Sequence, residues 1–133
     1  MKKPKFKVVA GFIRKDNKFL LVQRPFDKKN GGLWEFPGGK VEKDETLENA
    51  IKRELKEELG INVLSTEFVE KIEYDYDDFS IELYLFKIKN FSGKIDLKEA
   101  INMAWVDFNS VENLELCPAD KNLLQKLKEK INY

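Results

Sequence analysis

The chain has 133 residues, 42% of them hydrophobic and 36% charged, and this composition is typical of one globular domain with a buried core. Twenty-four Lys and Arg residues balance 24 Asp and Glu residues, so no net positive field exists to hold a nucleic acid polymer. The apolar runs are much shorter than the roughly 18 residues that span a bilayer, and the basic N-terminus lacks the pattern of an export signal. We therefore expect a single domain over residues 1–133, in a cytoplasmic protein that binds neither membranes nor nucleic acid polymers.

The sequence contains one cysteine, Cys117, and no histidine. An internal disulfide, a zinc site of His and Cys ligands, and catalytic pairs such as Ser-His or Cys-His are therefore excluded. Any metal ion that this chain binds must be held by oxygen ligands.

The first third of the chain predicts two strands and a long loop. Residues 6–13 and 19–22 are rich in β-branched and aromatic residues, and the polar segment 15–18 between them suits a chain reversal, which predicts an N-terminal hairpin. Residues 25–33 are polar and contain glycine, and residues 34–39, WEFPGG, end in a sequence where a strand is not expected to continue. We predict that this segment is a loop leading into a site.

The clearest local prediction is a helix over residues 46–59. Apolar residues recur there at helical spacing, with a threonine at the start and a glycine just after the end. Residues 61–76, 79–88 and 101–106 are aromatic and β-branched, which predicts three further strands. A second helix is predicted from about 118 to 131, with a proline in its first turn and a stripe of leucines.

The first helix places three carboxylates beside its apolar side. At about 100° per residue, Glu54, Glu57 and Glu58 project from that side of the helix. Glutamates on a helix usually lie at its solvated edge and pair with lysine, but carboxylates clustered in a last turn repel one another and the helix dipole. A divalent cation removes both penalties, and carboxylates without histidine or thiolate suit Mg²⁺ or Mn²⁺. Arg53 either orients the carboxylate of Glu57 or forms an ordinary surface pair with it.

Residues 38–61, GGKVEKDETLENAIKRELKEELGI, resemble the signature of the Nudix hydrolase family at every specified position. The matching positions are Gly39, Glu45, Arg53, Glu54, Leu55, Glu57, Glu58, Gly60 and Ile61. The order of the predicted elements around this segment is also similar to the whole Nudix fold. The resemblance therefore implies an α/β (α+β) architecture, in which a mixed β-sheet is sandwiched between helices.

The resemblance also implies roles for residues of the signature. Glu45 would support the metal site, and Arg53 would hold the glutamates in place. The implied reaction is the attack of water on a phosphorus atom of a nucleoside diphosphate linked to a further group, and in such a reaction the protein supplies positioning and charge stabilisation. The ion would be Mg²⁺, with Mn²⁺ as the alternative. Its ligands would be the backbone carbonyl of Gly38 and the side chains of Glu54, Glu57 and Glu58.

The flanking residues are most similar to the MutT-type branch, which hydrolyses nucleoside triphosphates, including oxidised ones such as 8-oxo-dGTP, to the monophosphate and pyrophosphate. A role in cleaning the nucleotide pool, and hence in DNA repair, follows from this similarity. By the same similarity Arg24 and Lys40 would contact phosphates, and Phe36 and Tyr76 would line the base pocket, although such aromatic residues are as often plain core. Glu99 would lie in a loop near the metal as a further ligand or the general base, or else be a solvated acid.

Asp120 leaves the preferred base open. The MutT enzyme most selective for 8-oxoguanine has an asparagine where the resemblance places Asp120, and an ionised carboxylate only accepts hydrogen bonds. Guanine and the amino group of cytosine would both satisfy it, so CTP and dCTP are alternative substrates. Asp120 also suits a helix start, where the dipole favours an acid.

Two other classes of function remain at this stage. One is Nudix hydrolysis of a different compound, such as ADP-ribose, a nucleotide sugar, a dinucleotide or a capped RNA end. The other is a nucleotide-binding module without hydrolysis, which the intact set of acids disfavours. The sequence is compatible with a monomer or a homodimer that binds a small nucleotide.

Overall fold

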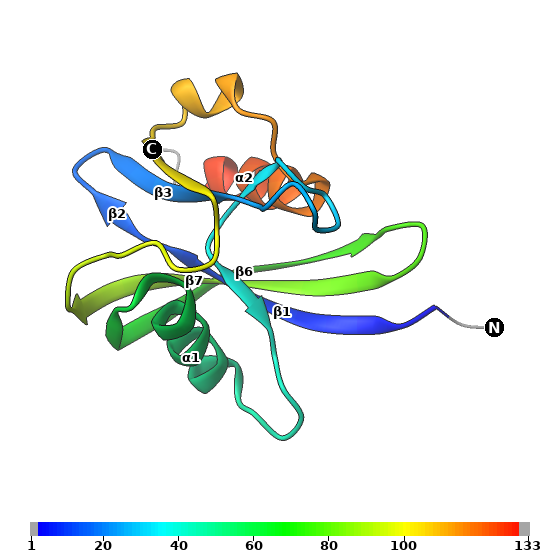
Figure 1. Ribbon diagram of the computed structural model, residues 1–133, viewed down its shortest axis with the longest axis horizontal. Coiled ribbons are helices and arrows are strands. Elements are labelled where there is room, and N and C mark those ends of the chain that lie inside the picture. The colour runs from blue at the N-terminus through cyan, green and yellow to red at the C-terminus, as the bar shows by residue number, and fades with distance from the viewer. Residues whose placement is uncertain (1–2, 131–133) are drawn as a thin grey trace.

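The computed structural model describes residues 3–130, which form two sheets and two α-helices (Figure 1). Among these residues, neither helix is long and apolar enough to cross a membrane. The helices are α1 (Leu47–Leu59) and α2 (Pro118–Lys130), and the 3-10 turn η1 covers Ser110–Asn113. The strands are β1 (Lys5–Phe12), β2 (Arg14–Lys15), β3 (Lys18–Gln23), β4 (Trp34–Glu35), β5 (Gly38–Lys40), β6 (Asn62–Asp75), β7 (Ser80–Ser92) and β8 (Asn102–Val106).

The larger sheet is mixed and has the strand order β5-β1-β7-β6. β1 pairs in parallel with β7 and antiparallel with β5, whereas β6 and β7 form a long antiparallel hairpin. The second sheet is antiparallel, with the order β2-β3-β4 and with β8 beside β3. In Figure 1, β1 and the β6–β7 hairpin cross the middle of the molecule, with α1 and α2 on opposite sides of them.

The core consists of two apolar clusters because the central strands bury side chains on both faces. Leu20 and Val22 of β3 pack in the cluster that holds Leu55 of α1, whereas Phe19 of β3 packs in the cluster that holds Leu123 of α2. Strands covered on both faces read as continuous apolar runs rather than alternating ones, and β3 has this pattern. The predicted α/β (α+β) fold, with helices on both faces of a mixed sheet, is confirmed.

The predicted N-terminal hairpin is wrong as a pairing of residues 6–13 with 19–22. The chain does reverse at residues 15–18, but only the two residues of β2 pair with β3, while β1 belongs to the other sheet. A two-stranded hairpin covers little apolar surface. In the middle of the larger sheet, by contrast, β1 buries Val9, Ala10 and Phe12 almost completely.

The other local predictions agree with the structure, with small differences. Helix 46–59 is confirmed as α1, with Thr46 as its cap, and β6, β7 and β8 correspond to the three later strands. The last residue of the predicted second helix, Ile131, lies outside the described residues. Residues 38–40 form the short strand β5 where a loop was expected, because β1 offers them backbone partners.

Candidate active site

Helix α1 is fixed at both ends by its own sequence. The Thr46 side chain accepts a hydrogen bond from the Asn49 N–H at 3.1 Å, and Gly60 ends the helix in the left-handed conformation, at φ 72°. Ala50, Ile51 and Leu55 are fully buried against the sheet. This packing sets the rotation of the helix and turns its glutamates toward β5.

Arg53 lies at the centre of the carboxylates of the signature. Its guanidinium donates to both oxygens of Glu45, at 2.7 and 2.9 Å, and to Glu54 at 3.0 Å and Glu57 at 3.2 Å. It also donates to the backbone carbonyl of Lys40 at 2.9 Å, which ties α1 to the end of β5. Hydrogen bonds from Arg53 lower the pKa of Glu45 to about 2. Glu45 is thus held ionised by Arg53, as a charge-assisted pair of this kind requires.

The fold buries the carboxylates of Glu58 and Glu54 without hydrogen bonds that fully offset the loss of their hydration. Glu58 is only 6% exposed, and the Gly38 N–H approaches it at 3.4 Å, a long hydrogen bond. Burial raises the pKa of Glu58 to about 8, and the nearby carboxylates of Glu35, Glu99 and Glu54 add to the effect. Burial also raises the pKa of Glu54, although the contact with Arg53 opposes this. A cation at this position would restore the ionised form of both groups.

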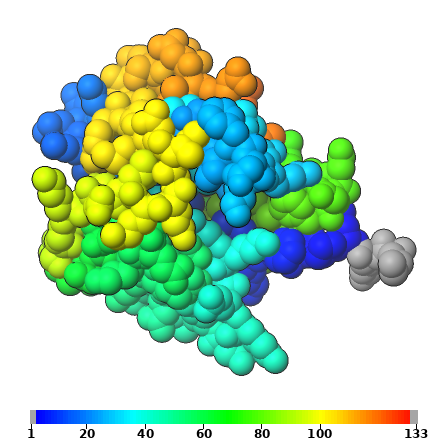
Figure 2. Space-filling view, viewed as in Figure 1, coloured from blue at the N-terminus to red at the C-terminus, as the bar shows by residue number. Residues whose placement is uncertain are grey.

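The chemistry of these groups fits a divalent metal ion. The donors available are carboxylate and carbonyl oxygens, which hard divalent cations prefer. Gly39 allows the backbone of β5 to lie close to Glu54, because a Cβ at that position would be 2.3 Å from Glu54 Oε1. The loop before β8 also lies against α1, where the Lys98 N–H donates to the Glu58 carbonyl at 3.0 Å (Figure 2). Glu99, the next residue, is therefore near enough to raise the pKa of Glu54 and of Glu58.

A pocket of about 260 Å³ opens beside these carboxylates, on the other side of β5. Gly38 and Gly39 line the pocket and also contact the glutamates of α1. Its walls are mostly aromatic and aliphatic, and its inner end is polar. The lining residues include Phe6, Val8, Ala10, Phe36, Tyr76, Phe79, Ile81 and Leu83, with Arg24, Lys29, Asn30, Glu35, Lys40, Cys117 and Asp120 as the polar ones.

Phe36 and Tyr76, the residues expected at a base pocket, both line it. Phe36 is also a core residue: it is 3% exposed and stacks on Phe19, with the ring centroids 5.9 Å apart. Tyr76 stacks on Phe79, and its hydroxyl accepts a hydrogen bond from the Ala119 N–H at 3.2 Å. Burial raises the pKa of Tyr76 to about 12, so it stays neutral. Phe36 is therefore both a core residue and part of the pocket wall.

The two cations expected at phosphates have different surroundings. The Lys40 ammonium lies over the ring of Phe6, 4.0 Å from its centroid, at the side of the pocket that holds Gly38 and Gly39. Arg24 instead donates to Glu35 at 3.2 Å and to the carbonyl of Lys29 at 2.7 Å. Arg24 is thus tied to an acid and to its own loop while it also lines the pocket, and its contact with a phosphate stays a prediction.

Glu35 is a buried acid of the pocket that the sequence reasoning missed, as it missed Lys29 and Asn30. Its side chain lies at the inner end of the pocket, where one oxygen of Glu35, the Cys117 thiol and one oxygen of Asp120 lie within 4.8 Å of one another. Burial raises the pKa of the Cys117 thiol, which therefore stays protonated and makes a poor metal ligand here. The signal for Glu35 was present in the sequence as a single acid between Trp34 and Phe36.

Asp120 is buried at the start of α2. It is 7% exposed, and its Oδ1 accepts a hydrogen bond from the Phe36 N–H at 3.0 Å. Burial raises the pKa of Asp120 well above its usual range, and the carboxylate of Glu35 adds to the effect. Asp120 therefore faces the pocket, as expected, and also joins α2 to the segment between β4 and β5.

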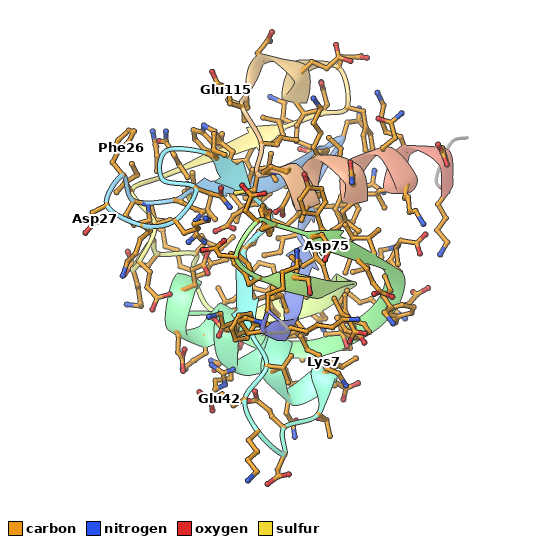
Figure 3. The ribbon with its side chains drawn as sticks, turned by 90° about the vertical axis from the view of Figure 1, so that its right-hand side faces the viewer. Lys7, Phe26, Asp27, Glu42, Asp75 and Glu115 are labelled. Carbon is orange, nitrogen blue, oxygen red and sulfur yellow. The ribbon has the colours of Figure 1, made fainter. Side chains whose placement is uncertain are left out.

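The loop between β3 and β4 closes one side of the pocket. Its Lys29 forms an ion pair with Asp78, at the β6–β7 turn, at 3.1 Å, and its ammonium lies over the ring of Phe79. Figure 3 shows Phe26 and Asp27 at the outer end of this loop, pointing away from the body of the molecule. Phe26 is 75% exposed. The inner residues of the loop therefore face the pocket, and its tip does not.

Comparison with known proteins assigns the chain to a family. The NUDIX domain family matches residues 4–127 of the chain. The chain therefore belongs to the Nudix family and is MutT-like, with several 8-oxo-dGTP diphosphatases among its relatives. It is a hydrolase of phosphoric anhydrides, and its family uses divalent metal ions.

Curated relatives and solved structures cover nearly the whole chain. CTP pyrophosphohydrolase of Escherichia coli is 39% identical over 118 residues, which are 89% of this chain and 87% of that protein. An 8-oxo-dGTP diphosphatase of Escherichia coli is 33% identical over 125 residues, 93% of this chain and 97% of that protein. The crystal structure of the MutT protein from Methanosarcina mazei has a TM-score of 0.88 and 26% identity, and the match covers 100% and 99% of the two chains.

Proposed function

We propose that this protein is a nucleoside triphosphate pyrophosphohydrolase that converts an oxidised or modified nucleotide, such as 8-oxo-dGTP, to the monophosphate and pyrophosphate. One observation carries the proposal: Gly38 and Gly39 form the wall between an aromatic pocket and a cluster of carboxylates. A base that fills the pocket has its phosphates directed past these glycines to the carboxylates, where the charge of a triphosphate must be neutralised. Hydrolysis of oxidised nucleotides serves DNA repair, and the nucleotide pool of the cytoplasm is the proposed place of action.

The donor set supports Mg²⁺, or Mn²⁺, as the ion. Glu54, Glu57 and Glu58, with the carbonyl of Gly38 and with Glu99 from the loop, would hold it. When bound, the ion neutralises charge on the triphosphate and makes water more acidic. The protein residues do the positioning.

Each remaining residue has a part that follows from its contacts. Arg53 keeps Glu54 and Glu57 in place through the hydrogen bonds described above, and Glu45 holds Arg53. Lys40, at the glycine side of the pocket, is placed to contact a phosphate. Water attacks phosphorus, its proton passes to a carboxylate of Glu54 or Glu99, and the bond between the α- and β-phosphates breaks.

CTP or dCTP is the second candidate substrate. The supporting observation is Asp120, whose side chain offers acceptors to an amino group, together with a relative at 39% identity that is a CTP pyrophosphohydrolase. Cytosine is smaller than 8-oxoguanine, and both carry an exocyclic amino group.

Product analysis tests the proposal. The protein is incubated with Mg²⁺ and, separately, with 8-oxo-dGTP, dGTP, CTP, dCTP and ADP-ribose, and products are separated by chromatography. Release of a monophosphate and pyrophosphate from a triphosphate supports the proposal, whereas cleavage of ADP-ribose alone would refute it.

A pair of variants on α1 tests the site itself. Glu57→Gln removes a charge from a side chain that is half exposed and that, within residues 3–130, pairs with Arg53 alone, so the fold should persist. We expect a loss of about 100-fold or more in kcat. The matched control is Glu48→Gln, on the same helix, where Glu48 pairs with Lys52 at the surface. Undiminished turnover of Glu57→Gln would show that the proposed site is wrong.

A further inference from the structure

A second groove lies away from the pocket that borders β5. It has a volume of about 380 Å³, and among residues 3–130 the two sites share no lining residue. Its walls come from β2, β8 and the end of β7 with the segment that follows it. In Figure 1, β2 and the end of β7 lie at the left, whereas the β6–β7 turn beside the first pocket lies at the right. The volume is within the range of small-molecule sites.

Two aromatic side chains form apolar walls of this groove. Phe91 of β7 and Trp105 of β8 are both partly buried against the cluster that holds α1. Within the part of the chain that the structure describes, their rings make no contact with each other. Met103, which lines the same groove, is 38% exposed. The apolar walls are therefore available to a flat ring, which aromatic side chains bind by stacking.

The charged residues that line the groove are all cations. They are Arg14, Lys15 and Lys94, and none of them forms an ion pair within residues 3–130. The Lys15 ammonium lies 6.0 Å from the centroid of the Trp105 ring, so positive charge adjoins the apolar wall. Asp96, the acid nearest to Lys94 along the chain, is paired with Lys98 at 3.4 Å. The three cations therefore attract an anion, and a phosphate accepts charge-assisted hydrogen bonds from arginine and lysine.

A nucleoside monophosphate has both features that the groove can bind. Its base is a flat ring that stacks on aromatic side chains. Its phosphate carries a charge of about −2 near neutral pH. An acidic peptide would satisfy the cations, but its carboxylates would leave the aromatic walls unused. The combination of aromatic walls and cations in one groove therefore favours a nucleotide.

The groove also borders the loop that carries Glu99. Lys94 lies near the start of this loop. Two residues later the loop is attached to the end of α1, where the Asp96 N–H donates to the Leu59 carbonyl at 2.9 Å. The hydrogen bond from the Lys98 N–H to α1 follows immediately. A ligand that binds Lys94 in this arrangement favours the attached state of the loop.

We propose that this groove is a second nucleotide site, which binds a nucleoside monophosphate with its base against Trp105 and Phe91 and its phosphate among the three cations, and whose occupancy holds the loop of Glu99 on α1. The site is separate from the one proposed for hydrolysis, so a nucleotide bound there regulates the enzyme and does not react. This regulatory role rests on the proposed function, whereas the binding site does not.

Tryptophan fluorescence tests the binding site. The chain has two tryptophans, Trp34 and Trp105, so in the variant Trp34→Phe the emission comes from Trp105 alone. This variant is titrated with AMP in EDTA. We expect quenching with a Kd of about 1 mM or tighter, and adenosine, which lacks the phosphate, should bind about 10-fold or more weakly. Absence of quenching by AMP, or equal binding of AMP and adenosine, would overturn the inference.

A charge reversal tests the cations. In the same background, Lys94→Glu changes an exposed side chain of the groove, so the fold should persist. We expect the Kd for AMP to rise about 10-fold or more. The matched control is Lys121→Glu, which makes the same change in net charge at an exposed position outside the groove, and should alter Kd less than about 2-fold. Equal effects of the two variants would show a general charge effect and overturn the assignment.

A peptide of six glutamates tests the class of ligand. We expect it to bind more weakly than AMP, because it offers no flat ring to the aromatic walls. Tighter binding of the peptide would assign the groove to an acidic protein segment and overturn the nucleotide site.

Hydrogen exchange tests the coupling to the loop. In EDTA, saturating AMP should slow exchange of the Asp96 and Lys98 amides about 3-fold or more in the wild-type protein, and not in Lys94→Glu. Unchanged exchange in the wild type would overturn the regulatory role. Neither the titrations nor the exchange uses a metal ion or a triphosphate, so they decide the inference even if product analysis shows that the proposed hydrolysis fails.

Discussion

Gly39→Ala should abolish most of the activity without unfolding the protein. A Cβ at this position would lie 2.3 Å from Glu54 Oε1 and 2.4 Å from its carboxyl carbon. An ordinary contact needs about 3.3 Å, so the carboxylate has to move by about 1 Å, and a misplacement of this size in an active site costs about 100-fold. A 100-fold loss in kcat corresponds to about 2.7 kcal/mol. The assay is kcat with Mg²⁺ and the preferred triphosphate, together with the melting temperature.

The neighbouring glycine provides the control. A Cβ at Gly38 would lie 1.9 Å from the carbonyl oxygen of Val9 in β1, and the residue has φ +156°. Backbone in a paired strand cannot give way as the end of a glutamate can. Gly38→Ala should therefore lower the free energy of unfolding by about 3 kcal/mol or more, whereas Gly39→Ala should shift the melting temperature by less than about 4 °C. Full activity in a folded Gly39→Ala protein would refute the reasoning.

Three further predictions concern the metal, pH and Arg53. Mg²⁺ at about 100 times its Kd should stabilise the native protein by about 2.7 kcal/mol, and calorimetric melting without any shift would contradict the site. Burial raises the pKa of Asp120, so its stability contribution is complete at acid pH and is lost as pH rises through that pKa. In EDTA, the melting temperature should therefore fall between pH 5 and 9 less steeply in Asp120→Asn than in the wild type or in Asp77→Asn, and equal slopes would count against this. Arg53→Lys should lose most of kcat because an ammonium cannot replace the fork that joins Glu45 to α1; unchanged kinetics would show that the fork is dispensable.

Local signals in the sequence were enough to predict α1 and the carboxylates on it. Thr46, Gly60 and the apolar spacing between them act over one helix, so the helix forms as the sequence indicates. The N-terminal hairpin failed for the opposite reason. β1 pairs with β7, about 75 residues further along the chain. The residues next to β1 in the sequence do not indicate this pairing. The chain reversal was read correctly, and the strand pairing was not.

In the pocket, too, some residues were predicted correctly and the contacts made by strand pairing were not. Phe36, Tyr76 and Asp120 were placed there by resemblance, and all three line it. The same resemblance placed Arg24 at a phosphate; in the fold its guanidinium lies 3.2 Å from Glu35, and the phosphate contact stays a prediction. The pairing of Arg24 with Glu35 depends on the register of β3 against β4, which the sequence alone does not specify.

The two apolar clusters have a consequence for how such an enzyme diversifies. The glutamates proposed as metal ligands lie on α1, which packs in one cluster, whereas Phe36 and the start of α2 pack in the other. A substitution that reshapes the proposed base pocket therefore disturbs mainly the cluster that does not hold α1, and effects at separated sites tend to add rather than couple. Substitutions in the cluster that holds Phe36 can therefore change the preferred base, while the carboxylates on α1 and the hydrolysis proposed for them are retained.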